Sequence, residues 1–410
     1  MTSVRYMHID QTVFGVFHHF ELANQLHRRG HLRRIYSTWP WARLKREGLP
    51  RSVVGTFPWI HTSEMAMSRF GLHRPWLQDQ LSYANAVAFD TWTAARIRRT
   101  KAPDALIALS GSSLTTGRQI QAAGGVFICD RGSSHQRYQE QIVSDEYARW
   151  GVQRPVSDLR DTIREEKIYE AADVITVPSS FASRSFIESG LPREKIHVIP
   201  YGVCLERFTR TSEPPVGRFE MLFAGSVGLR KGVPYLLQAF AALRHPAKRL
   251  RLAGTLNPDI KTILSSLPCE FVEFLGPVSQ QQLAELMSTS HIMVLPSIEE
   301  GLALVQGQAL ACGCPVLCST NTGGEDLFTD GVEGFIVSIR DVAALTAKMQ
   351  QLADDPALQQ RMSEAALQRV RSIGGWNEYG DRWESLLLNL TGKTEATMPE
   401  LPDYAPPPTK

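Results

Sequence analysis

The chain has 410 residues, of which 43% are hydrophobic and 21% charged, and its formal net charge at pH 7 is +2. At about 100–200 residues per domain, this length predicts two domains with cores of ordinary size. No apolar run approaches the ~20 residues of a membrane span. The first residues also do not combine a basic flank with an apolar run, as a signal peptide would. We therefore exclude the integral membrane class and expect a cytoplasmic protein.

The positive charge is concentrated in the N-terminal part of the chain. Residues 1–104 carry 15 Lys and Arg against 7 Asp and Glu, a net charge of +8, so the remaining chain carries −6. Basic clusters lie at residues 27–34, 43–51 and 96–101. Two interpretations remain open: these are solvated helix faces, or they attract an anionic membrane surface or an acceptor phosphate. We expect no nucleic-acid partner.

The six cysteines do not have the pattern of a metal site. A zinc site needs four ligands in a loop setting, whereas Cys314 and Cys318 flank and occupy an apolar, strand-like run. The sequence therefore predicts thiols that are buried in the core, and no bound metal.

Short apolar runs alternate with amphipathic, helix-like stretches along the chain. The helix expected at 279–290 shows the pattern well, with Ser279 as N-cap and Gln282 three residues later. Such alternation is typical of α/β proteins with doubly wound parallel sheets. The expected strands are residues 104–109, 125–130, 173–179, 195–201, 219–225, 249–254, 271–276, 291–297, 314–319 and 334–339.

The series of strands is interrupted at 209–218, a segment with two prolines and no periodicity. We expect one Rossmann-like domain over residues 1–208 and a second over 209–374. A helix at 375–390 would cross back to the first domain, and the Pro-rich tail at 391–410 is expected to be disordered. Because ligands bind beyond the carboxyl ends of parallel strands, two such domains facing each other would bind them in a cleft.

The segment 296–316 carries the strongest chemical signal. A strand-like run ends at Ser297, an acidic loop containing Gly301 follows, and a helix then begins. Backbone N–H groups at a helix start can bind phosphate or sugar oxygens, and a carboxylate can bind sugar hydroxyls. The segment resembles family 4 (group 1) of the retaining glycosyltransferases of the GT-B fold, which carry two Glu separated by seven residues. Glu300 matches the first, and Gln308 replaces the second.

This resemblance implies roles for the residues of the loop and helix. Glu300 would contact a hydroxyl of the donor sugar, and Gln308 would bind the ribose through its amide, without the strength of a charged partner. The alternative is a surface loop whose acidic residues only cap the next helix. Backbone contacts to the sugar and diphosphate would come from Gly301, Leu302, Ala303, Leu304 and Val305.

A second segment, 223–240, places cations in a strand-to-helix turn, which suits a diphosphate. Lys231 is followed by Gly232 and not by Ser or Thr, so the turn is not a Walker A loop. It resembles the Lys-Gly element of the same family, whose Lys binds the donor phosphates. Gly225, Ser226 and Arg230 would complete the phosphate site. The turn at 276–282 resembles the family's nucleobase-binding turn, with Pro277 and Val278 at the base.

The resemblance extends over residues 11–390 and is looser in the N-terminal half. There it implies a His near the donor sugar or the reacting centre, for which His135 is the candidate and Asp130 the alternative. Residues expected to line the acceptor side of the cleft are Gly15, His18, His19, Ser110 and Asp130.

The sequence thus predicts a nucleotide-sugar-dependent, retaining hexosyltransferase without metal or other cofactor. It would act on a hydroxyl of a glycan, glycolipid or small-molecule acceptor in cell-envelope or exopolysaccharide synthesis. The expected partners are the donor, a glycan or lipid-linked acceptor, and an anionic membrane contacted through the basic N-terminal domain. The alternative is a catalytically weakened binding protein of the same fold. A nicotinamide-dependent dehydrogenase is disfavoured because the glycine spacing in 225–232 is wrong.

Overall fold

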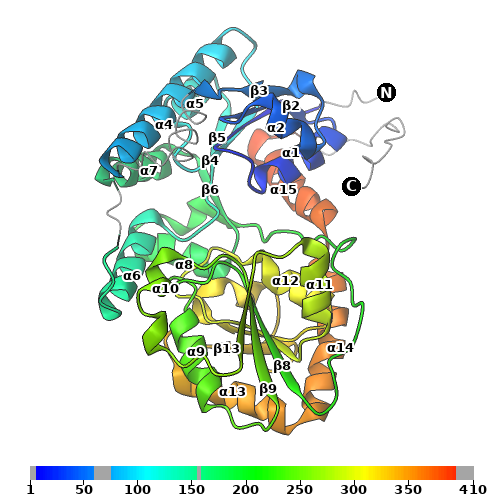
Figure 1. Cartoon of the computed structure of the whole chain (residues 1–410). Coiled ribbons are helices and arrows are strands. Elements are labelled where there is room, and N and C mark those ends of the chain that lie inside the picture. Colours follow the sequence, from blue (N-terminus) through cyan, green and yellow to red (C-terminus); the bar gives the residue numbers. More distant parts are fainter. Residues whose placement is uncertain (1–5, 60–74, 155–157, 394–410) are drawn as a thin grey trace.

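The computed structural model describes residues 6–59, 75–154 and 158–393. They form two lobes, each built around one parallel sheet (Figure 1). The first sheet has seven strands in the order β3-β2-β1-β4-β5-β6-β7, and the second has six in the order β10-β9-β8-β11-β12-β13. Two α/β lobes with doubly wound sheets are the predicted fold class.

The N-terminal lobe holds the strands β1 (Ile9–Val13), β2 (Leu32–Ser37), β3 (Val54–Thr56), β4 (Ala105–Leu109), β5 (Val126–Asp130), β6 (Val174–Val177) and β7 (Ile196–Val198). Its helices are α1 (His19–Arg28), α2 (Trp41–Leu44), α4 (Pro75–Arg98), α5 (Leu114–Ala122), α6 (Gln136–Arg149), α7 (Leu159–Ala171) and α8 (Ser180–Glu188), with short 3₁₀ turns η1 (Lys45–Glu47), η2 (Arg51–Val53) and η3 (Arg193–Lys195).

The C-terminal lobe holds the strands β8 (Phe219–Ala224), β9 (Lys248–Ala253), β10 (Val272–Gly276), β11 (Ile292–Leu295), β12 (Val316–Ser319) and β13 (Gly334–Val337). Its helices are α9 (Val233–Ala242), α10 (Pro258–Lys261), α11 (Gln280–Ser288), α12 (Leu304–Ala311), α13 (Val342–Asp354) and α14 (Pro356–Ile373), with 3₁₀ turns η4 (Leu264–Ser266), η5 (Thr320–Thr322) and η6 (Gly324–Asp326).

The continuous apolar runs are central strands that are covered on both faces. Every residue of β8, β11 and β12 is buried, which is why these strands do not show the alternation of a half-exposed sheet. The helix after β10 begins as predicted, because Ser279 and Gln282 form a reciprocal capping box at the start of α11. Cys129, Cys312, Cys314 and Cys318 are buried, and Cys204 and Cys269 are half-buried; all six are free thiols.

The last described helix, α15 (Trp376–Thr391), belongs to the N-terminal lobe. It lies beside α1, although the two helices come from opposite ends of the chain (Figure 1). Trp383 is fully buried there, Arg29 forms an ion pair with Glu384 at 3.2 Å, and His31 forms a hydrogen bond with the same carboxylate at 2.6 Å. The expected crossover helix therefore exists. From residue 394 onward, the expected tail lies outside the described residues.

The chain crosses between the lobes twice, and the two crossings are in contact. The amide of Val203 donates to the carbonyl of Gly374 at 3.3 Å. A Cβ on Gly202 would lie only 2.4 Å from the carbonyl oxygen of Gly375. The two connecting segments therefore pass each other at backbone contact distance. No helix within the described residues is long and apolar enough to cross a membrane.

Candidate donor and acceptor cleft

Lys231 and Glu300 come together at the carboxyl ends of two neighbouring strands. Lys231 lies in the turn between β8 and α9, and Glu300 in the loop between β11 and α12. Their side chains form an ion pair, with exposed fractions of 13% and 12%. The Nη1 atom of Arg230 lies 3.2 Å from the Glu300 carboxylate and donates to the carbonyl of Glu299 at 2.8 Å. The two segments singled out in the sequence therefore form one cationic and acidic cluster.

The predicted donor-binding residues surround this pair. Gly225 lies beneath Lys231, whose Nζ would be 3.9 Å from a Cβ at that glycine. The first turn of α12 has no side-chain cap, so its N–H groups are not satisfied by a side chain of the N-cap residue. Leu302 and Ala303 are buried, whereas Leu304 is exposed. Ser226, Val305 and Gln308 are half-buried. The structure thus brings the predicted residues together between two strand ends, and their contacts with a donor stay predictions.

The neighbouring residue Glu299 joins the two lobes. Its fully buried carboxylate accepts hydrogen bonds from the Ser133 hydroxyl (2.6 Å), the Ser134 hydroxyl (2.8 Å) and the Gln139 amide (2.7 Å) of the N-terminal lobe. Burial opposes its ionisation, but the charge of Arg230 and these hydrogen bonds outweigh burial and hold the pKa of Glu299 below its ordinary value. An ionised carboxylate therefore fastens the Glu300 loop to the opposite lobe. The sequence did not lead us to predict this role.

The backbones of the two lobes also touch at this point. A Cβ on Gly301 would lie 2.1 Å from the carbonyl oxygen of Gly132. The Ser179 hydroxyl, from the N-terminal lobe, donates to the carbonyl of Gly301. Within the loop 131–135, the largely buried side chain of Arg131 donates to Ser110, Gln136 and Gln139. The predicted cleft residue Ser110 thus supports the loop that contacts Glu299.

A His–Asp cluster lies in the N-terminal lobe, beside the loop that touches Gly301. His18 Nε2 is 2.8 Å from Asp130 Oδ2, His19 Nε2 is 3.3 Å from the same oxygen, and the Thr176 hydroxyl donates to Oδ1. His18 also borders Gly132, since a Cβ on that glycine would lie 3.3 Å from its Cε1. The cluster therefore adjoins the loop that touches Gly301. Burial would raise the pKa of Asp130, but the charge and hydrogen bond of His18 outweigh it and hold that pKa below its ordinary value.

The structure places His135 elsewhere. Its ring packs against Tyr169 and Phe186, with centroids 5.1 Å apart in each case, and only 3% of the residue is exposed. Burial lowers the pKa of His135 to about 4. The histidine beside Asp130 is instead His18, the N-cap residue of α1, in the connection that follows β1. Gly15 lies next to the Trp39 ring, and its carbonyl accepts from Ser37.

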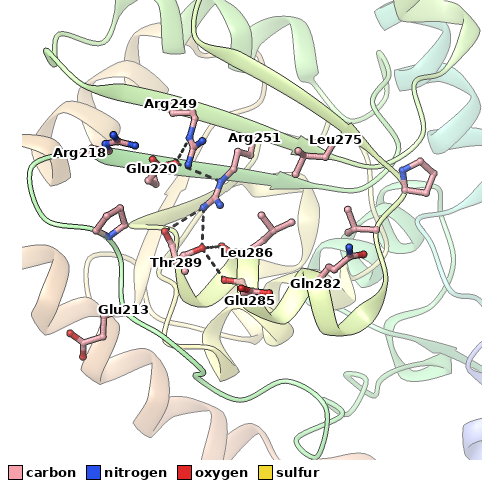
Figure 2. A pocket seen from close by; sticks show the side chains of 13 residues that line it. Glu213, Arg218, Glu220, Arg249, Arg251, Leu275, Gln282, Glu285, Leu286 and Thr289 are labelled. Carbon is pink, nitrogen blue, oxygen red and sulfur yellow. Dashed lines mark hydrogen bonds and ion pairs between the residues drawn. The ribbon is translucent and has the colours of Figure 1, made fainter. Parts of the chain in front are cut away.

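The predicted nucleobase turn lies at one end of a groove of about 720 Å³ in the C-terminal lobe. The groove is lined by α11, by β8, β9 and β10, and by the segment after the first crossing (Figure 2). Leu275 and Gln282, which flank Pro277 and Val278 in the sequence, lie at one end of the groove, and Glu213 and Arg218 lie at the other (Figure 2). The space is large enough for a base, and contact of Pro277 and Val278 with a base remains a prediction.

Within the described part of the chain, one group of His, Cys, Asp or Glu side chains has the spacing of a metal site. It consists of His18, His19 and Asp130, whose ligand atoms lie within 4.8 Å of one another. Imidazole and carboxylate suit zinc and other transition ions. In the structure, however, His18 and Asp130 are already in direct hydrogen-bond contact.

The buried His19 gives a prediction for stability against pH. Burial, assisted by the charge of His18, lowers its pKa to about 3 from 6.5. The unfolded chain therefore binds one more proton than the folded chain between these values. The contribution of neutral His19 to stability is complete above pH 6.5 and is lost as the pH falls towards 3. We expect His19→Gln to flatten the decline of the unfolding free energy between pH 6.5 and 4, measured by denaturant unfolding.

The exposed His8 supplies the matched control, because His8→Gln removes an imidazole without changing the buried cluster. That variant should keep the wild-type slope. Equal slopes for His19→Gln and the wild type would contradict the assignment.

Comparisons with known proteins find similarity to glycosyltransferases over most of the chain. The sequence profile of the glycosyl transferases group 1 family matches residues 206–369, and that of the glycosyl transferase 4-like domain matches residues 19–202. A D-inositol 3-phosphate glycosyltransferase of Streptomyces avermitilis is 30% identical over 236 residues, which cover 52% of this chain and 51% of the relative. The chain spans about half the length of the relatives it matches.

Solved structures show the same fold at lower identity. A sucrose-phosphate synthase from Thermosynechococcus elongatus superimposes with a TM-score of 0.72 at 19% identity, covering 95% of this chain and 100% of the other. HepE from Anabaena, solved in complex with UDP, gives a TM-score of 0.67 at 15% identity, covering 93% and 100%. The two matched profiles, which together span most of the chain, and the shared two-lobed fold show that the chain belongs to the group 1 glycosyltransferases of family 4 and has the GT-B fold.

Proposed function

We propose that the protein transfers a hexose from a nucleoside diphosphate sugar to an acceptor hydroxyl, with retention of anomeric configuration. The observation that carries the proposal is the Lys231–Glu300 ion pair at adjoining strand ends, closed over by the N-terminal lobe through Glu299. A cation for the diphosphate and a carboxylate for sugar hydroxyls are thereby held a few ångströms apart. Relatives named as glycosyltransferases, and the UDP bound to HepE, favour a UDP-sugar as the first donor to test.

The mechanism that we propose depends on exchange of partners at this pair. In the free protein, Lys231 and Glu300 neutralise each other. On donor binding, the diphosphate pairs with Lys231 and a sugar hydroxyl donates a hydrogen bond to Glu300, so neither charge is left without a partner. As the bond to the sugar breaks, negative charge grows on the leaving phosphate, and Lys231, Arg230 and the first N–H groups of α12 stabilise it.

The N-terminal lobe would supply the acceptor side. The His18–Asp130 pair adjoins the Gly132 loop and offers a hydrogen bond to a hydroxyl placed between the lobes. The leaving phosphate oxygen would accept the proton of the attacking hydroxyl on the same face of the sugar, which gives retention. We propose a glycan, glycolipid or small polyol as acceptor, and cell-envelope or exopolysaccharide synthesis at the cytoplasmic side of a membrane as the setting.

A thermal-shift screen against UDP-, GDP-, CDP- and dTDP-sugars tests the proposal. One donor class should raise the melting temperature, and the same donor should be hydrolysed or transferred with the anomeric configuration retained, as read by NMR of the product. Stabilisation without turnover would favour the alternative of a catalytically weakened binding protein. The absence of stabilisation by any of them would contradict the proposed function.

We expect the transfer to need no metal ion. Dialysis of the enzyme against EDTA should leave kcat within about twofold of its starting value. His18, His19 and Asp130 are the residues to examine if this fails. The expectation would be overturned if chelation removed the activity and zinc or manganese restored it. The activity of an Asp130→Asn variant should then no longer respond to chelation.

Gln308 lies where the family carries its second Glu, in the second turn of α12. A carboxylate binds a hydroxyl more strongly than an amide does, so Gln308→Glu should lower the donor KM about three- to tenfold with little change in kcat. The exposed Gln281 offers a control, because Gln281→Glu changes the net charge equally on the surface of α11. An unchanged or higher KM for Gln308→Glu would argue that this side chain does not face the ribose.

A further inference from the structure

The three basic clusters of the N-terminal part converge on one hollow. A cavity of about 320 Å³ lies between β2, β3 and α4. Arg34 comes from the cluster at 27–34, Arg51 from 43–51 and Arg96 from 96–101. The cavity is lined by Arg34, Tyr36, Arg51, Ser52, Val54, Gly55, Thr56, Trp92 and Arg96. Three guanidinium groups and no carboxylate therefore surround it.

These three guanidinium groups are held in place without being neutralised. Arg34 donates to the carbonyl of Ser52 at 3.3 Å, and Arg51 donates to the carbonyl of Val54. Arg96 lies 5.1 Å from the centre of the Trp92 ring. None of the ion pairs found among the described residues involves them. Each guanidinium carries five N–H donors, so most of these donors remain free to bind an acceptor.

Two arginines of the cluster at 27–34 differ in this respect. Arg29 pairs with Asp381 at 2.5 Å, and Arg33 pairs with the fully buried Asp10. In the groove of Figure 2, Arg249 and Arg251 both lie against Glu220, at 2.8 and 3.6 Å. Several arginines of this chain are therefore neutralised by a carboxylate, whereas the three that line the cavity are not.

The floor of the cavity is formed by packed aromatic rings and carries further donors. The Tyr36 ring meets Trp92 edge-to-face, with centroids 5.8 Å apart and an interplanar angle of 86°. A Cβ on Gly55 would lie 2.5 Å from the Tyr36 ring, so the ring can lie over β3 only because residue 55 is a glycine. The hydroxyls of Ser52 and Thr56 also line the space. Its volume equals roughly ten water volumes, enough for a phosphate and a small attached group.

We propose that Arg34, Arg51 and Arg96 form a phosphate-binding site on the N-terminal lobe. Guanidinium forks bind phosphate oxygens in pairs, and a phosphoester would neutralise the charge that the cavity leaves uncompensated. The site binds the phosphate of a soluble phosphorylated molecule or of an anionic lipid headgroup. None of its lining residues belongs to the Lys231–Glu300 cluster, so the site is independent of the proposed donor chemistry.

The test uses the full-length protein and two ligand sources. Titration calorimetry with glycerol 3-phosphate reports the soluble source, and sedimentation with phosphatidylglycerol vesicles, against phosphatidylcholine vesicles, reports the lipid source. The variant is Arg34→Gln/Arg51→Gln/Arg96→Gln. Loss of three charge-assisted contacts should weaken binding by about 100-fold or more. Lys231→Ala should bind as the wild type does, which separates this site from the diphosphate subsite.

A matched variant, Arg46→Gln/Arg98→Gln/Arg99→Gln, removes the same charge from exposed positions in two of the clusters and leaves the cavity intact. It should bind within about threefold of the wild type. The single variant Arg96→Gln, at an exposed position on α4, guards against misfolding and should by itself weaken binding about tenfold. Equal losses in the two triple variants, or binding in neither arm, would overturn the proposal. If the cavity variant loses binding mainly to glycerol 3-phosphate, the ligand is a soluble phosphoester; if it loses binding mainly to the phosphatidylglycerol vesicles, the ligand is a lipid headgroup.

Discussion

Lys231→Ala is expected to lower kcat by about 10²–10³-fold, because it removes the fixed cation that faces the leaving diphosphate. In the free protein Lys231 pairs with Glu300, but Glu300 keeps Arg230 at 3.2 Å, so the fold should not depend on the lysine. The KM for the donor should rise as well, because the ground-state diphosphate also contacts Lys231. Steady-state kinetics with the donor found by thermal shift measures both constants.

The matched controls for this variant are chosen from the same lobe. Lys261→Ala removes an exposed lysine in α10 and should leave kcat unchanged. Glu300→Gln, which keeps the size of the side chain, should reduce kcat without weakening the binding of the nucleoside diphosphate itself, since its proposed partner is the sugar. A Lys231→Ala enzyme with wild-type kcat would contradict the assignment of the diphosphate subsite.

Gly301→Ala is expected to have a second large effect, through closure of the lobes and not through donor contacts. The new Cβ would lie 2.1 Å from the Gly132 carbonyl oxygen and 2.7 Å from the Ser133 Cα, and both are backbone atoms that cannot turn aside. The lobes must then separate, which also pulls Glu299 from Ser133 and Ser134. Because a misplacement of about 1 Å can cost about 10²-fold in rate, we expect a loss of that size in kcat/KM.

Nucleoside diphosphate binding should survive this change, because its proposed contacts come from the C-terminal lobe. Calorimetry should give a Kd within about threefold of the wild type, and small-angle scattering should show a larger radius of gyration. Gly375→Ala is the control for an added methyl group at the junction of the lobes, since its φ is −96° and its Cβ would come no closer than 3.4 Å to another atom. If Gly301→Ala keeps both full activity and the wild-type radius of gyration, the contact with Gly132 does not govern closure.

Much of the fold could be predicted from the alternation of apolar runs and amphipathic helices. The runs at 104–109 and 291–297 correspond to β4 and β11, and the break at 209–218 lies between β7 and β8. The first three strands were not predicted. β1 contains the fully buried Asp10 and Gln11, and β2 contains Arg33, which pairs with Asp10. Paired charges inside a sheet remove the apolar signal on which the prediction depends.

The residues of the candidate site likewise fall into those that could be predicted from the sequence and those that could not. Lys231 and Glu300 could be found because each follows a strand and carries a local motif. The roles of Glu299 and Arg131 could not, because they depend on contacts such as Ser133 to Glu299, between residues 166 positions apart. The pairing of His18 with Asp130 also depends on the sheet, which brings residues 112 positions apart together. A local sequence pattern cannot reveal contacts between residues that lie so far apart in the chain.

Because α15 belongs to the N-terminal lobe, this lobe cannot finish folding until the end of the chain has been synthesised. The lobe that is synthesised first lacks its partner for α1 until residues 376–391 have left the ribosome. Until then Arg29 and His31 have no carboxylates, and the space that Trp383 fills is empty. The first lobe is therefore completed last, and a fragment ending near the first crossing would expose an apolar surface to chaperones and aggregation.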